Sequence, residues 1–193
     1  ENVLLNYSDI RRDQEYDLIA NKAVARLSSS ENIYDIAIDG DVLSQKIRIQ
    51  QETFFREKQM RIKSEFNYHV NSDSINILPS LIYVHDSKFL VEGVYHGADK
   101  NYVNISSTGE NTDIQTILSL MSESVYNKFK VYRSEGNIYF SSTLVGNISE
   151  TDSPELRINF GSKNASLYHP DIKRKLENVN LEGEFYSKKA NDL

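Results

Sequence analysis

Apolar and polar residues alternate along most of this chain with a period of two, most clearly from residue 60 to residue 70. The apolar positions of this stretch are Met60, Ile62, Phe66, Tyr68 and Val70, and the polar ones are Arg61, Lys63, Glu65, Asn67 and His69. Only Ser64 interrupts the apolar set. Because successive side chains of a strand point to opposite faces, the pattern predicts a half-buried strand, long compared with the usual length of about five or six residues.

The same alternation recurs in shorter stretches that end in turn-favouring residues. The apolar positions are Tyr34, Ile36 and Ile38; Ile47 and Ile49; Ile75 and Ile77; Phe89, Val91 and Tyr95; Leu156, Ile158 and Phe160; and Val179, Leu181 and Phe185. The turn-favouring segments are 39–41, 71–73, 85–87, 97–99, 135–137 and 161–164, and the three prolines, Pro79, Pro154 and Pro170, are expected at strand boundaries. Such short connections make hairpins, so the sequence predicts a mainly β fold with one long antiparallel meander.

One segment changes from strand to helix spacing. Thr112 stands three residues before Gln115, which is the spacing of a capping box, and apolar residues then recur every three or four positions. These residues are Ile114, Ile117, Leu118, Met121 and Val125. The sequence therefore predicts one amphipathic helix near 113–128, packed against one face or end of the sheet.

Composition places the chain among folded proteins with one domain over residues 1–193. The hydrophobic fraction of 39% can supply a core, and no linker or charge block divides the 193 residues. The net charge is −6, which argues against a nucleic-acid partner because such proteins neutralise phosphates with clustered Lys and Arg. No apolar run approaches the roughly 18 residues of a membrane-spanning helix.

Chemistry-bearing motifs are scarce. The chain has no Cys, which excludes disulfides, thiolate zinc sites and cysteine nucleophiles. None of the four histidines, at 69, 85, 96 and 169, has a partner at a recognised metal-ligand spacing, and no serine stands in a nucleophile elbow. We therefore expect no catalytic residues, no metal site and no cofactor, and hence a protein that is not an enzyme.

The long apolar strand faces admit two interpretations. They can close on each other as the core of a β-sandwich, which is typical of structural or interaction modules. Alternatively, one continuous apolar face stays partly uncovered and receives an apolar ligand. The alternation by itself does not decide between these readings.

Several segments, read in order, resemble one family. These are the opening ENVLLNYSD, DGDVLSQKIRI after a turn, SINILPSLIYVHDSKFLVEGVYHG, the helical NTDIQTILSLM, the strands of VYRSEGNIYFSSTLVGNISETDSPELRINFGSKNASL, and LENVNLEGEFY. This succession of strands, helix and turns is similar to the AsmA-like (AsmA/TamB-type) periplasmic proteins of Gram-negative bacteria, whose architecture is similar to that of bridge-like lipid-transfer proteins. Family members often place Pro just after the helix, where this chain has Met121-Ser122-Glu123.

The resemblance implies an antiparallel sheet curled into an open, taco-like groove, apolar inside and polar outside. It implies a non-enzymatic segment that shelters phospholipid acyl chains for intermembrane lipid transport and outer-membrane biogenesis. The segment would be periplasmic, held by an inner-membrane anchor outside it, with outer-membrane assembly proteins as further partners. The candidate groove residues are Ile36, Ile38, Ile62, Phe66, Tyr68, Ile158 and Phe160. The alternative is a structural or interaction β-sandwich module of a cell-surface or phage protein.

Overall fold

The protein is described from a computed structural model that covers residues 2–10, 13–49, 52–97, 101–112, 114–120, 122–149, 152, 154–171 and 173–186. The strands are β1 Val3–Asp9, β2 Gln14–Ser30, β3 Ile33–Ile49, β4 Glu52–Phe54, β5 Lys58–His69, β6 Ser74–Val84, β7 Ser87–His96, β8 Tyr102–Thr112, β9 Arg133–Asn147, β10 Glu155–His169 and β11 Arg174–Tyr186. Two helices, α1 Ile114–Leu120 and α2 Glu123–Phe129, lie between β8 and β9.

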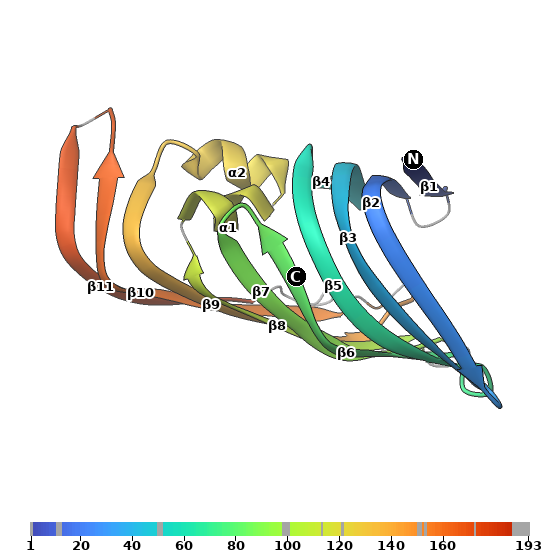
Figure 1. The fold of residues 1–193 in the computed structure, drawn as a ribbon. Coiled ribbons are helices and arrows are strands. Elements are labelled where there is room, and N and C mark those ends of the chain that lie inside the picture. The colour runs from blue at the N-terminus through green and yellow to red at the C-terminus, as the bar shows by residue number, and fades with distance from the viewer. Residues whose placement is uncertain are drawn as a thin grey trace.

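All the described strands belong to one antiparallel sheet. Its order follows the chain from β1 to β11, except that β4 pairs with β3 beside the start of β5. The predicted mainly β meander is therefore confirmed. The strands bend along their length, so the sheet is curved, with β1 and β11 at its two free edges (Figure 1). The described part of the chain contains no second sheet of the kind a β-sandwich requires.

The strands are longer than the turn-favouring residues suggested. The turns at 71–73 and 85–86 are present, but β3 runs without a break through Asp39-Gly40-Asp41, β9 through 135–137 and β10 through 161–164. The three predicted turns at these places are therefore wrong. Gly40 serves a close approach between strands instead, because a Cβ atom there would lie 2.6 Å from the Cα atom of Ala23 in β2. The predicted turn at 97–99 lies largely outside the described residues.

Pro79 also lies within a strand rather than at a strand boundary. In β6, Leu78 and Pro79 together oppose Glu65 of β5 on one side and Glu92 of β7 on the other. Two residues facing one make a β-bulge, which tolerates a residue that has no N–H to donate. The expectation for Pro79 was wrong because only the partner strands reveal the bulge.

The single predicted helix is in fact two short ones. Ser122 has the extended values φ −61° and ψ 153°, so the chain leaves helical geometry there and α2 starts anew. The side chain of Gln115 donates a hydrogen bond to the carbonyl oxygen of Tyr132, and the amide of Ile114 donates to the hydroxyl of Ser134 at 3.0 Å. The start of α1 is thus held by Tyr132 and by Ser134 of β9. The side chain of Thr112, the other partner in the predicted capping box, lies outside the described side chains. Met121 lies outside the described residues.

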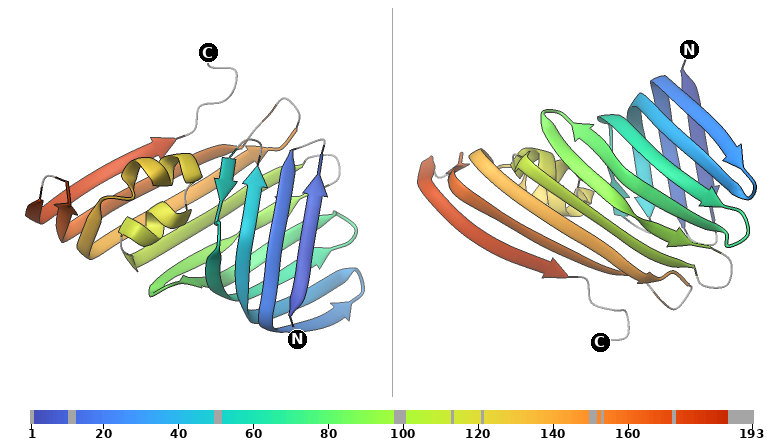
Figure 2. Two further views of the ribbon diagram at one scale, coloured as in Figure 1. Left: turned by 90° about the horizontal axis from the view of Figure 1, so that it is seen from above. Right: turned by 60° about the horizontal axis from the view of Figure 1, so that its bottom comes forward.

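The buried core lies beneath the helices. Met60, Val84 and Phe89 form a buried cluster, with Phe55, Ile62, Ile82 and Phe140 packed against it. Seen from above, α1 and α2 lie in front of the sheet, and seen from below they lie behind it (Figure 2). The helices therefore occupy the inner side of the curve. We identify the sheet face that carries the cluster as the concave face and the opposite one as the outer face.

Candidate functional site

Strand register places the apolar positions on the concave face. Residues paired directly across antiparallel strands have their side chains on the same face of the sheet, and successive residues of one strand alternate between the two faces. One row of such pairs crosses eight strands, and we call it the apolar row: Leu27, Ile36, Phe66, Ile77, Gly93, Ile105, Leu144 and Leu156. Apart from Gly93 every member is a large apolar residue, so the concave face carries a continuous apolar path.

All seven candidate residues from the sequence lie on this face. Ile36, Ile38, Ile62, Phe66 and Tyr68 come from β3 and β5, whereas Ile158 and Phe160 come from β10. Four strands, β6 to β9, separate these two groups. Ile158 is only 6% exposed and Phe160 is 38% exposed, while the other five candidates are half-buried.

The residues that join the two groups are not among the candidate groove residues. Ile77, Ile105 and Leu144 connect β6, β8 and β9 in the apolar row. The alternation around Ile77 and Ile105 was visible in the sequence, but which strands lie between β5 and β10 depends on their pairing. Leu144 stands among polar and small residues in SSTLVGN, so its own segment carries a weak signal.

Serine hydroxyls interrupt the apolar surface next to this row. Ser64 and Ser80 bond to each other at 2.9 Å between β5 and β6, and Ser107 and Ser142 do the same between β8 and β9. Each pair satisfies its own hydroxyl groups, so these serines can lie on an apolar face at little cost. The interruption at Ser64 in the sequence pattern has this explanation.

Toward β11, an aromatic ring covers a glycine. Phe160 pairs with Gly183, and a Cβ atom on that glycine would lie 2.7 Å from Cε2 of the Phe160 ring. Phe160 also pairs with Phe140, whose ring meets Phe89 edge-on at 5.9 Å between centroids. A row of three phenylalanines thus extends from the buried core toward the exposed Phe160.

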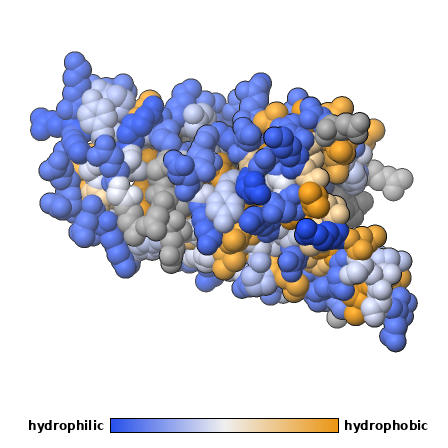
Figure 3. All heavy atoms as spheres, in the orientation of Figure 1, coloured by the Kyte–Doolittle hydropathy of each residue, from blue (hydrophilic) through white to orange (hydrophobic). Residues whose placement is uncertain are grey.

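The concave face is least covered near β1. Leu5 of β1 is 54% exposed and Leu27 of β2 is 68% exposed, and both belong to this face by register. In the space-filling view, apolar surface gathers toward the side on which β1 to β5 lie (Figure 3). The helices thus cover only part of the concave face. The apolar surface of β1 and β2 beside them stays open.

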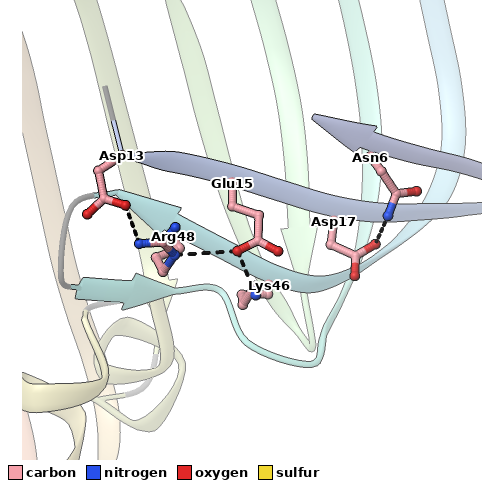
Figure 4. A network of polar contacts seen from close by, with 6 residues as sticks. All are labelled: Asn6, Asp13, Glu15, Asp17, Lys46 and Arg48. Atoms are coloured by element: carbon pink, nitrogen blue, oxygen red, sulfur yellow. Dashed lines mark hydrogen bonds and ion pairs between the residues drawn. The ribbon is translucent and has the colours of Figure 1, made fainter. Parts of the chain in front are cut away.

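The outer face is polar and rich in ion pairs. Lys46 and Glu15 lie 2.8 Å apart, Arg48 contacts both Glu15 and Asp13, and Asn6 donates a hydrogen bond to Asp17 (Figure 4). The hydrogen bond from Lys46 lowers the pKa of Glu15 below its usual value. The two faces of the sheet therefore differ in polarity, as the alternation predicted.

A shallow hollow of about 560 Å³ lies over β2, β3 and β5. At its centre Ala37 pairs with Arg26 on one side and Glu65 on the other, and these three belong to the outer face. The short Ala37 side chain between two long ones leaves this space. Leu27, Ile36 and Phe66 of the apolar row also line the hollow, so it reaches this row as well as the outer face.

No catalytic arrangement is evident in the described ranges. His69 contacts the side chain of Asn76 at 3.2 Å, His96 lies beside Tyr102, and His169 meets the ring of Tyr132 edge-on. No group of three or more His, Asp or Glu among the described residues could hold a metal ion. Within the same residues, neither helix has the length and hydropathy needed to cross a membrane.

Comparisons with protein-family models, curated proteins and solved structures give no match to this chain. The interpretation of the concave face therefore depends on its own geometry and chemistry.

Proposed function

We propose that this protein is a non-enzymatic, lipid-sheltering segment that binds phospholipid acyl chains on its concave face during transport between membranes. The observation that carries the proposal is the apolar row, which runs across eight strands on the inner side of a curved sheet. With neighbouring strands roughly 4.8 Å apart, this path is about 34 Å long. An acyl chain could lie along it across the strands.

The free energy of hydration explains why such a surface is needed. Each methylene group exposed to water costs about 0.8 kcal/mol, so a chain of about sixteen carbons faces on the order of 10 kcal/mol in an aqueous compartment. An apolar groove relieves this cost without any covalent chemistry.

The sequence resemblance to the AsmA-like family supports a cellular location for this function. We propose that the segment works in the periplasm of a Gram-negative envelope, tethered through an inner-membrane anchor, and contributes to outer-membrane biogenesis. Outer-membrane assembly proteins would be its further partners.

A structural or interaction module is the second candidate, and the edge strand β1 favours it. Val3, Leu4 and Leu5 are all more than half exposed, and no charged residue occurs from Val3 to Ser8. Edge strands usually carry charges that discourage pairing with other chains. An uncharged apolar edge would suit an added strand from a partner.

The test compares one change on each face of the sheet. Phe160→Glu places a carboxylate on the apolar face at a side chain that is already 38% exposed, so the sheet should still form. Thr143→Glu makes the same charge change at an exposed position on the outer face, opposite Arg157. We expect the unmodified protein to take up an acyl-chain fluorescent fatty acid, Thr143→Glu to retain this uptake, and Phe160→Glu to lose most of it.

Far-ultraviolet circular dichroism verifies that both variants remain folded. A folded, unmodified protein that never binds the fatty acid would rule out the lipid-sheltering proposal and favour the interaction module.

A further inference from the structure

A cavity of about 280 Å³ lies where the helices meet the start of β5. One wall comes from β4, β5 and their connection, and the other from α1 and α2. Its lining residues are Thr53, Phe55, Arg56, Glu57, Lys58, Ser119, Glu123, Tyr126 and Asn127. α2 and β4 are in contact, as their positions in the view from above also indicate (Figure 2).

Two polar contacts join the walls beside the cavity. Arg56 and Glu123 form an ion pair at 3.3 Å, and the hydroxyl of Ser124 donates a hydrogen bond to Glu52 at 2.8 Å. Arg56 and Glu123 therefore neutralise each other. Among the charged lining residues this leaves Lys58 and Glu57, and the cavity has no net charge.

Lys58 is the lining cation that remains available. No ion pair joins it to an acidic side chain in the described part of the chain, and it is half-buried. By register it lies on the concave face, opposite Ser44 of β3 and two residues before Met60 in β5. The cation therefore stands at the end of the same face that carries the apolar row.

The cavity also adjoins the apolar core. Phe55, which lines it, packs against the buried cluster of Met60, Val84 and Phe89. The neighbouring Thr53 and Tyr126 add neutral hydroxyl donors. The lining thus combines a cation, hydroxyl groups and a link to the apolar core, which matches the polar and apolar parts of a phospholipid.

We infer that this cavity is a headgroup site, in which Lys58 binds the phosphate of a phospholipid whose acyl chains lie on the concave face. The balanced charge of the lining suits a headgroup that is zwitterionic overall. This inference rests on the proposed lipid-sheltering function and adds to it the site that binds the headgroup.

The test measures the affinity for two lipids that carry the same fluorescent acyl chain, a phosphatidylcholine and a diacylglycerol. The diacylglycerol lacks the phosphate, so only the phosphatidylcholine should depend on Lys58. We expect Lys58→Gln to weaken phosphatidylcholine binding about tenfold and to leave diacylglycerol binding unchanged. Lys58→Arg, which keeps the cation, should restore most of the lost affinity.

Lys63→Gln is the matched control, because Lys63 lies on the outer face of the same strand. It should leave the affinity for both lipids unchanged. Inorganic phosphate at millimolar concentration should not displace the phosphatidylcholine, since a phosphate without acyl chains lacks the apolar contacts.

The outcomes separate the two proposals. If neither lipid binds the unmodified protein, the lipid-sheltering function fails and the headgroup site with it. If both lipids bind but Lys58→Gln weakens them equally or not at all, the headgroup site is wrong while the function stands. Displacement by inorganic phosphate would show a simple anion site and would also overturn the inference.

Discussion

Phe66 and Glu65 are neighbours in β5, yet they belong to opposite faces of the sheet. Phe66 pairs with Ile36 and Ile77 on the concave face, whereas Glu65 pairs with Ala37 on the outer face. At the residue scale, the contribution of a side chain to stability should therefore follow its face rather than its position along the chain.

The first prediction compares these two positions. Phe66→Ala should lower the free energy of unfolding by about 2 kcal/mol, less than the roughly 3 to 5 kcal/mol of a fully buried phenylalanine, because Phe66 is half-buried. Glu65→Ala should stay within about 0.5 kcal/mol. Urea denaturation followed by circular dichroism measures both values, and similar losses at the two sites would contradict the register.

Asn67, the other outer-face neighbour of Phe66, is less suitable than Glu65 as a control for the Phe66→Ala variant. Its side chain donates a hydrogen bond to Asp35 at 2.6 Å, so a change to Asp would set two carboxylates against each other. The polar pattern in the sequence placed Asn67 on the outer face, but it did not reveal this contact.

At the scale of the elements, glycines inside strands allow close approach rather than turns. Gly93 of β7 pairs with Ile77 just beside the bulge in β6, and with Ile105 on its other side. A Cβ atom at Gly93 would lie 2.6 Å from the Cα atom of Ile105 and closer still to the carbonyl oxygen of Asn104. The pairing of β7 with β8 therefore depends on the absence of a side chain.

The second prediction follows from this contact. Gly93→Ala should destabilise the protein by about 1 to 3 kcal/mol, because the new methyl group meets backbone atoms that cannot rotate away. Glu92→Ala, at the neighbouring exposed position, should change the free energy of unfolding by less than about 0.5 kcal/mol. Thermal unfolding of both variants tests the difference. An unchanged midpoint for Gly93→Ala would mean that β7 and β8 lie farther apart.

At the scale of the whole molecule, burial is uneven across the sheet. The core cluster lies under the helices in β5, β6 and β7, while β1 up to Ser8 and the second half of β2 are exposed. Local opening costs least free energy where few apolar contacts must break. The middle of the sheet should therefore be its most stable part.

The third prediction is measured by amide hydrogen exchange. Amides near Val84 and Phe89 should exchange most slowly, and those of β1 should exchange fastest among the strands. Slow exchange throughout β1 would contradict the prediction and would indicate that another strand pairs with this edge.

The sequence by itself determined which side chains share a face, and the tertiary structure decided which of them meet. Alternation is a local property of an extended backbone, so within each strand it separated Ile36, Phe66 and Ile158 from their polar neighbours before any pairing was known. The predictions for Gly40, Pro79 and Ser122 were wrong because their roles depend on neighbours distant in the chain. Gly40 lies against Ala23, and Pro79 lies in a bulge that β5 and β7 define. The break at Ser122 depends on the strands against which α1 and α2 pack. The cavity beside Lys58 has the same origin. Its two walls lie more than 50 residues apart in the sequence, and only the folding of the helices back onto β4 brings them together.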